Sequence, residues 1–442
     1  MKKQIFKSLF TIACLLFSTN ASAYDFEVNG IYYTVESFTK LTCNVVSGEE
    51  KYKGDVVIPA TVDYNGKTLT VVGIYSLTFW YCSDLTSITI PNTVSSIDYI
   101  GTGCDKLEYV KIEDGEKALT IGGHVFEDCP IVTLYVGRNL SYGSGVDSPF
   151  YGVKTIKNLT IGESVTEISS YEFYGCDNIA SVIIPNSVTQ IYQGAFSGCS
   201  GLTSVTLGNS LVRLGEYAFY GCSNLTNITI PNSVTRIDSY AFYGCYSLTT
   251  MVIPDAVTLL GAYVFYDCGA LADITIGNSV TEIGTLAFYN CTNLINVTLG
   301  NSIKKINSSA FENCSSLTTI TLPCTVTSIG SSAFYGCSGL STLYSLNTTP
   351  PSIKGFENDH YLNLNVYVPQ EALEAYQNAD GWMNFWNLHG FVSTEIKNVV
   401  PNISDIKEIK RYDAAGRESG SNHKGLTIIK MSDGTTKKVM VK

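Results

Sequence analysis

Cysteine recurs every 23 residues through the centre of this chain, and the period never slips. A phenylalanine stands three residues before each of these cysteines. A fixed period of this length marks a chain that folds as stacked copies of one supersecondary unit, each burying its neighbour's open face. The cysteines are Cys176, Cys199, Cys222, Cys245, Cys268, Cys291, Cys314 and Cys337.

One copy shows what each unit folds into. Ile228 and Ile230 alternate with polar residues, which predicts a short strand with one buried face, and Pro231 ends it. Ser239 and Gly244 bracket a segment that we expect to form one capped helical turn. Strands of successive copies should pair in parallel.

Irregular copies extend the array upstream. Cys82, Cys104 and Cys129 keep the cysteine position at uneven spacing, and a further copy has Phe150 in phase with Val153 in place of cysteine. A degenerate opening copy begins at Val56, with a turn inserted at 63–66.

We therefore expect five segments: a signal peptide at 1–23, an N-terminal cap at 24–55, a solenoid at 56–345, a C-terminal cap at 346–398 and a small β tail at 399–442. The C-terminal cap should contain a helix over 370–379 and cover the last open coil.

The repeat resembles the BspA-like leucine-rich repeat of Bacteroidetes surface proteins. The pattern L-T-x-I-x-I-P-x-S-V-x-x-I-x-x-x-A-F-x-x-C is matched almost position by position in 223–244 and 315–336. The resemblance covers about residues 56–345. It implies a right-handed, β-dominated leucine-rich-repeat solenoid with parallel strands and short helical turns. It also implies a secreted or surface-exposed adhesin-like protein, and it carries no catalytic residues.

The tail reads as three strands, within 409–417, 424–430 and 437–442. Its arrangement resembles the C-terminal sorting domains of type IX secretion, although it is shorter than usual for them. A β appendage without a sorting role stays open as the alternative.

The start of the chain predicts export. Lys2 and Lys3 precede a short apolar run, and Ala21-Ser22-Ala23 fits a cleavage site before Tyr24. Cys14 offers lipoprotein processing as a minor alternative. The apolar run is too short for a transmembrane helix. The net charge of −11 argues against a nucleic-acid partner. We expect a secreted or cell-surface protein.

The chain has fourteen cysteines, and export permits disulfides. Eleven of them share one repeat position, which Val153 fills once. A position that accepts cysteine or valine is a small buried apolar slot, so we expect free thiols there. Disulfides between adjacent coils are the alternative.

Nothing in the sequence assembles a catalytic, cofactor or metal site. The four histidines are His124, His360, His389 and His423, so none falls in the regular array. The cysteines lack zinc-ligand spacing. We expect a protein that is not an enzyme and needs no cofactor.

Binding is then the expected role, through outward strand positions or a column of tyrosines. Both surfaces have simpler explanations: small polar residues suit any exposed sheet, and the tyrosines could merely pack. The expected partner is a host or bacterial surface macromolecule, protein rather than glycan; a glycan-binding module and a passive stalk are the alternatives. The candidate strand positions are Asn227, Thr229, Thr250, Asp273, Thr275, Asn296, Thr298, Thr319 and Thr321, and the candidate tyrosines are Tyr220, Tyr243, Tyr266 and Tyr289.

Overall fold

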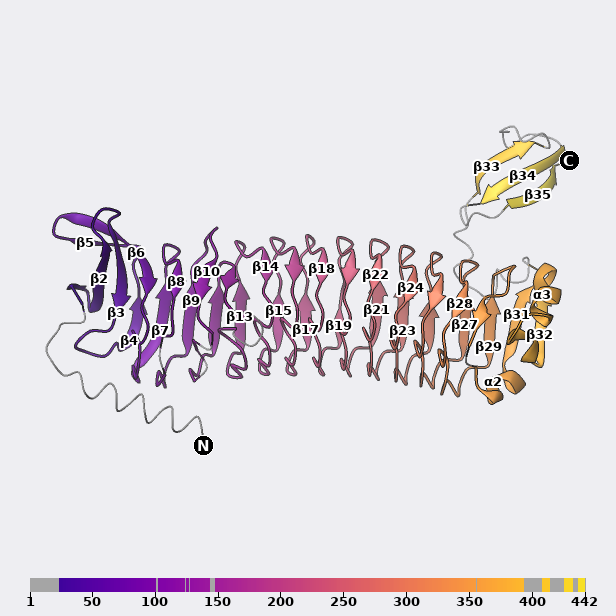
Figure 1. Cartoon of the computed structure of the whole chain (residues 1–442), viewed down its shortest axis with the longest axis horizontal. Coiled ribbons are helices and arrows are strands. Elements are labelled where there is room, and N and C mark those ends of the chain that lie inside the picture. Colours follow the sequence, from indigo (N-terminus) through magenta and orange to yellow (C-terminus); the bar gives the residue numbers. More distant parts are fainter. Residues whose placement is uncertain are drawn as a thin grey trace. The chain divides into compact units, whose positions relative to one another are not determined.

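The computed structural model describes residues 24–392 except Gly101, His124, Glu127, 144–147 and Gly355, together with the backbone of three strands between 408 and 441. The expectations for the signal segment 1–23, Cys14, His124 and His423 lie outside these residues. The chain divides into two compact units, Met1–Ile179 and Ala180–Lys442. Figure 1 traces the element order along the chain. None of the described helices is long and apolar enough to cross a membrane.

The first unit opens with antiparallel strands β1 (Phe26–Val28), β2 (Ile31–Ser37) and β3 (Thr42–Val46). A hairpin of β5 (Thr61–Tyr64) and β6 (Lys67–Ile74) follows. Asn65 and Gly66 form its two-residue turn with φ of 50° and 71°. Two positive φ angles are what an Asn-Gly turn supplies at little cost. Of the turn predicted at 63–66, residues 65–66 form the turn, whereas 63–64 belong to β5.

The coils of the first unit carry two columns of parallel strands. The first column is β4 (Gly54–Val57), β7 (Leu85–Ile90), β9 (Tyr109–Ile112), β11 (Thr133–Val136) and β13 (Asn158–Ile161). The second column continues from β6 through β8 (Ser96–Ile97), β10 (Leu119–Ile121) and β12 (Leu140–Ser141), and β14 (Glu167–Ile168) lies in the coil after β12.

The second unit repeats this plan with a shift of 23 residues between most of its paired strands. Its first column is β15 (Ser181–Ile183), β17 (Ser204–Thr206), β19 (Asn227–Ile228), β21 (Thr250–Ile253), β23 (Asp273–Ile276), β25 (Asn296–Thr298), β27 (Thr319–Leu322) and β29 (Thr342–Ser345). Its second column is β16 (Gln190–Ile191), β18 (Arg213–Leu214), β20 (Arg236–Ile237), β22 (Leu259–Leu260), β24 (Glu282–Ile283), β26 (Lys305–Ile306), β28 (Ser328–Ile329) and β30 (Ser352–Ile353).

The repeated phenylalanines form a stacked ladder inside each unit. The Phe219 and Phe242 ring centroids lie 5.6 Å apart with nearly parallel planes, and both side chains are fully buried. In the first unit Phe150 stacks between Phe126 and Phe173, and Val153 is buried in the cysteine slot. The predicted leucine-rich-repeat solenoid with parallel strands and buried ladders is confirmed.

The segment predicted as a capped helical turn is instead a run of tight turns. Tyr240 adopts φ of 61°, which interrupts a right-handed helix. Its N–H donates to the Ala262 carbonyl in the next coil at 3.0 Å, and Phe242 donates to Val264 at 2.9 Å. These amides bond between coils rather than along a helix, so a local helical prediction was wrong here.

The ladder thiols are buried and form hydrogen bonds to the preceding coil. From Cys222 to Cys337, each donates to the carbonyl oxygen of a phenylalanine 26 residues earlier, as Cys222 does to Phe196 at 3.2 Å. The prediction of free buried thiols is confirmed for Cys222, Cys245, Cys268, Cys291, Cys314 and Cys337. Cys324, outside the ladder, is exposed.

The second unit ends in two more parallel strands, β31 (Asn365–Pro369) and β32 (Asn387–Phe391), with short helices before and between them. The helices are α2 (Asn358–Asn363), η1 (Gln370–Ala372), α3 (Leu373–Gln377) and η2 (Trp382–Asn384). Trp382 is fully buried, and its Nε1 donates to the Pro351 carbonyl at 2.7 Å. The predicted helix over 370–379 is present as η1 and α3.

The tail holds the three strands that its pattern predicts. They are β33 (Glu408–Asp413), β34 (Gly425–Met431) and β35 (Thr436–Val441), joined as one antiparallel sheet in chain order.

Candidate binding surface

The first outward column of the second unit lies where the alternation places it. Asn227, Thr250, Asp273, Asn296 and Thr319 are all exposed. Thr250 pairs with Asp273, and Asp273 pairs with Asn296, so equivalent positions stand side by side on neighbouring strands.

The other outward column is less uniform. Thr229 and Thr275 are exposed, whereas Thr298 and Thr321 are half-buried. Thr229 lies just beyond the end of β19 at Ile228. The first column forms three separate sheets, β15-β17-β19, β21-β23-β25 and β27-β29-β31-β32, so the face made by the outward strand positions is interrupted twice.

This strand face is polar with little charge. Asp273 is the acidic member of the candidate set, and its Oδ1 accepts a hydrogen bond from the Asn296 amide. Ile183 and Val252 add isolated apolar side chains that are 70% and 62% exposed. Such a face offers many weak polar contacts rather than one strong ionic contact.

The four candidate tyrosines stack face to face. The ring centroids are 4.8 Å apart for Tyr220–Tyr243, 4.6 Å for Tyr243–Tyr266 and 4.5 Å for Tyr266–Tyr289. Tyr220 is 36% exposed and the other three are half-buried. The rings therefore cover one another and leave only part of each accessible.

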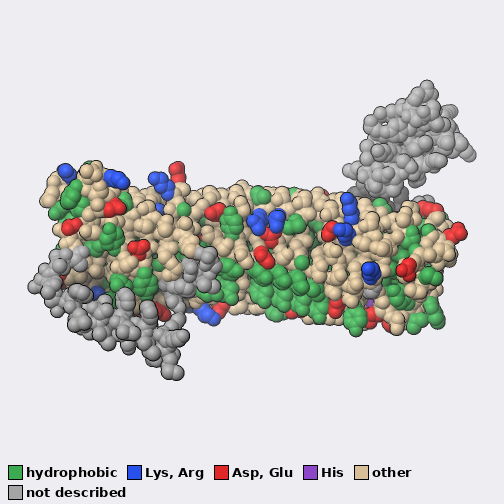
Figure 2. All heavy atoms as spheres, in the orientation of Figure 1, with side chains coloured by type: hydrophobic (Ala, Val, Ile, Leu, Met, Phe, Trp, Pro, Cys, Tyr) green, Lys and Arg blue, Asp and Glu red, His purple; other side chains and the backbone are tan. Residues whose placement is uncertain are grey.

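A second tyrosine column, missed in the sequence, runs beside the first. Tyr217, Tyr240 and Tyr263 stack at 4.7 and 4.6 Å, and all three have positive φ. Tyr217 also contacts Tyr220 at a steep angle, with centroids 5.7 Å apart. The signal was present in the sequence as a tyrosine two residues before Phe219, Phe242 and Phe265. Figure 2 shows hydrophobic side chains gathered in one patch near the middle of the visible face.

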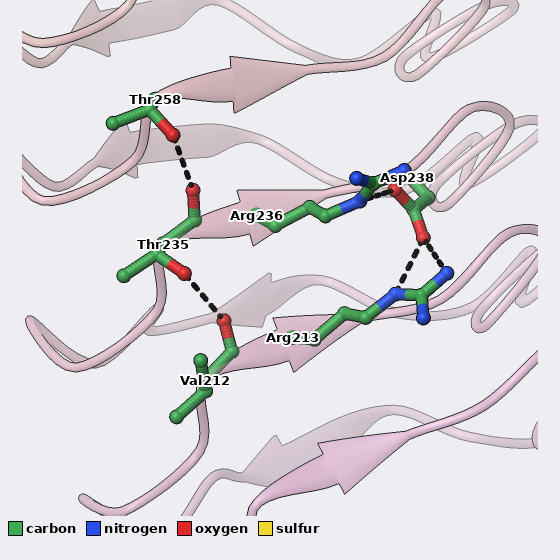
Figure 3. A network of polar contacts seen from close by, with 6 residues as sticks. All are labelled: Val212, Arg213, Thr235, Arg236, Asp238 and Thr258. Atoms are coloured by element: carbon green, nitrogen blue, oxygen red, sulfur yellow. Dashed lines mark hydrogen bonds and ion pairs between the residues drawn. The ribbon is translucent and has the colours of Figure 1, made fainter.

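The second strand column carries a partly buried ionic contact that the sequence did not reveal. Arg213 and Arg236 lie opposite each other on β18 and β20, where two like charges would repel. Asp238, only 5% exposed, lies between them: its Oδ2 is 2.8 Å from Arg213 Nε, and its Oδ1 binds Arg236 Nε. Beside them, Thr235 donates to the Val212 carbonyl, and Thr258 to that of Thr235 (Figure 3).

The described residues contain no group of three or more His, Cys, Asp or Glu side chains placed to hold a metal ion. Buried His360 contacts the backbone carbonyl of Cys337 through Nε2 rather than its thiol. Burial raises the pKa of the Cys222 and Cys245 thiols, the reverse of what activates a nucleophile.

A family model for the BspA-type leucine-rich repeat region matches the chain in six copies, over residues 72–145, 146–272 and 235–365. These matches cover most of the residues whose stacked coils are described above.

Solved structures of bacterial repeat proteins are similar to this chain. A leucine-rich repeat protein from Bacteroides ovatus is 28% identical, with a TM-score of 0.53, over 80% of this chain and 97% of that one. A leucine-rich cell surface protein from Faecalibacterium prausnitzii is 23% identical, with a TM-score of 0.37, over 86% of this chain and 98% of that one. Among curated proteins, none is significantly similar to this chain.

Proposed function

Because the chain belongs to the BspA-type leucine-rich-repeat family, we propose that it is a secreted or cell-surface adhesin-like protein that binds an extracellular protein without catalysis. The binding surface is made of the outward strand face of the second unit and its two tyrosine columns. Repeated, weakly charged side chains on neighbouring strands present many similar contacts to an extended partner.

The stacking of the tyrosines is the observation that favours a protein partner over a glycan partner. A sugar ring binds an aromatic side chain by lying on its flat face, and here neighbouring rings 4.5–4.8 Å apart cover those faces. The accessible parts of the ladder are ring edges and hydroxyl groups, which suit side chains and backbone groups of a protein.

The first test is capture of partners by purified protein from extracellular matrix and bacterial surface proteins, in parallel with a glycan array. Selective capture of a protein supports the proposal. Binding confined to glycans favours the glycan-binding module, and no binding in either assay favours the passive stalk.

Lysine substitutions then locate the surface. Thr229→Lys and Thr275→Lys place a bulky cation on the strand face, where Lys111 already occupies the equivalent position in the first unit. Thr281→Lys is the matched control, because it is equally exposed but lies outside both candidate surfaces, and Lys304 fills its equivalent in the next coil. We expect the first two to weaken binding at least tenfold and the control to leave it unchanged.

The repeated coils allow a quantitative prediction of binding affinity. If each coil adds one weak contact, affinity should fall stepwise as whole 23-residue coils are removed from the second unit, since linked contacts add through effective concentration. Loss of all binding on removal of one end would instead assign the site to that end.

For export, we propose cleavage before Tyr24 and a tail that directs surface display or release. The five segments, 1–23, 24–55, 56–345, 346–398 and 399–442, are the proposed organisation. Deleting 401–442 and fractionating cells tests the tail: unchanged surface exposure would remove its sorting role.

A further inference from the structure

Strand β4 forms an open edge of the sheet in the first unit, whose order is β13-β11-β9-β7-β4. Ile58 donates its N–H to the Thr89 carbonyl on β7 at 3.1 Å. Since backbone groups alternate sides along a strand, Val57 directs its N–H and carbonyl to the other side. No strand among the described residues pairs with that side, and the Val57 side chain is 63% exposed.

A groove of about 610 Å³ runs along this edge. One wall is β4 itself, and the other comes from the β1–β2 hairpin and residues 50–53. Gly54 at its margin has φ of 64°, and a Cβ placed on it would meet no atom within 4 Å. The groove therefore leaves this side of β4 open, and Gly54 adds open space next to it.

Strand β32 forms the last edge of a sheet in the second unit. Just before it, Trp386 is 78% exposed and Met383 is 61% exposed, although Trp382 in the same segment is fully buried. Leu388 on β32 is only half-buried, whereas its equivalents in the two preceding coils, Leu343 and Val366, are fully buried. An apolar edge of this kind marks a surface that lacks a neighbour.

We propose that the missing neighbour is a second copy of this chain, with β32 of one molecule pairing in parallel with β4 of the next. Each edge supplies what the other lacks. Strand β32 pairs only with a strand that precedes it in the chain, and β4 pairs only with a strand that follows it. Joining them reproduces the relation between any strand and its successor in the repeat.

The repeat register sets the contacts at this joint. Leu388 aligns with Val56, because both occupy the inward position of their coils. The Val57 N–H donates to the Leu388 carbonyl, and the Gly390 N–H donates to the Val57 carbonyl. Trp386 then enters the groove beside Gly54, and Leu388 gains the cover that its equivalents already have.

The joint is heterologous, so each molecule keeps one free edge of each kind and association continues into open chains of molecules. Both partners carry the same net negative charge, −11 for the full sequence. Salt screens that repulsion, so we expect association to increase with salt concentration.

The experiment uses two variants, each blocked at one end, in a Cys324→Ser background that excludes a disulfide through the exposed cysteine. Val57→Pro removes the outward N–H at a position where an edge strand tolerates proline. Trp386→Glu places a charge on the other edge. Val57→Thr and Trp386→Phe are the conservative controls.

We expect analytical ultracentrifugation to show the mean mass of the parent and of both controls rising with protein concentration. Each blocked variant should remain monomeric alone. Mixed, the two should form a 1:1 dimer and nothing larger, because each supplies the edge that the other lacks.

A parent protein that stays monomeric at every concentration overturns the proposal. The parent would also stay monomeric if β4 instead received a strand from a different extracellular protein. Association of either blocked variant alone, or failure of the mixture to form dimers, also overturns it. Circular dichroism confirms folding. If Val57→Pro unfolds, a peptide of residues 384–392 is added to the parent protein instead. The peptide should pair with β4 and shorten the parent's assemblies. Assemblies of unchanged length would contradict the proposed joint.

Discussion

The thiol of Cys245 donates a hydrogen bond to the backbone carbonyl oxygen of Phe219, 3.3 Å away in the preceding coil. The same oxygen also accepts the N–H of Cys222 at 3.2 Å, so both of its lone pairs are used. Cysteine thus fills a small buried slot and supplies a donor between coils, which valine cannot do. This arrangement explains why the position keeps cysteine through the regular array.

Replacing Cys245 with alanine should lower the free energy of unfolding by about 1–2 kcal/mol, because it removes a buried sulfur and an inter-coil hydrogen bond. Urea unfolding followed by circular dichroism measures the change. Cys324→Ala is the matched control and should stay within about 0.5 kcal/mol of the parent, since Cys324 is exposed. Equal effects at the two positions would contradict this role for the ladder thiol.

Stability should be insensitive to thiol and phenol ionisation at pH 7 and should fall as the solution becomes alkaline. Burial raises the pKa of Cys43 to about 12 and that of Cys82 to about 11, from an ordinary value of 9.0. Burial first, then neighbouring Tyr266, raises the pKa of Tyr243 to about 12. Above pH 9 the unfolded chain releases protons that the folded chain retains, which favours unfolding.

Chemical denaturation at pH 7, 9, 10 and 11 tests this dependence. The same folded samples treated with an alkylating reagent should label Cys324 and leave the ladder thiols unlabelled until denaturant is added. Stability that rises between pH 9 and 11 would show that the buried groups ionise in the folded protein.

Tyr240 holds a left-handed backbone conformation at a cost of about 1 kcal/mol and stacks on Tyr217 and Tyr263. Tyr240→Phe keeps both stacking contacts and should change stability by less than about 0.5 kcal/mol. Tyr240→Ala keeps the strained backbone but loses both contacts and should cost about 1–3 kcal/mol. Thermal unfolding compares them, and an alanine variant as stable as the parent would mean that the tyrosine stack adds nothing.

Asp238 separates two arginines on neighbouring strands, so Asp238→Ala should leave Arg213 and Arg236 in unrelieved repulsion and cost about 1–3 kcal/mol. Combining Asp238→Gly with Arg236→Leu should recover much of that loss, because the next coil carries Leu259 and Gly261 at these positions. Denaturant midpoints at low and high salt measure both. A larger loss at high salt than at low salt would contradict repulsion as the cause.

The candidate surface was only partly predictable. Alternation along the strands correctly placed Asn227, Thr250 and Asp273 on the exposed face, because side chains of an extended chain must alternate. The same reasoning could not show that β19 ends before Thr229 or that the face is divided among three sheets. Those interruptions depend on how closely successive coils approach one another.

The sequence by itself determined the stacking unit and its core, since a 23-residue period makes each residue the neighbour of its own equivalent and so specifies the phenylalanine, leucine and cysteine ladders. Tertiary structure alone decided the backbone conformation of Tyr240 and whether the flat faces of the tyrosine rings are covered by neighbouring rings. Local propensity favours a helical turn at Tyr240. The hydrogen bonds to the next coil form only when the coils stack, and these bonds outweigh the local helical propensity. The open edges at β4 and β32 were likewise decided by tertiary structure, because a strand becomes an edge only when its neighbours are in place.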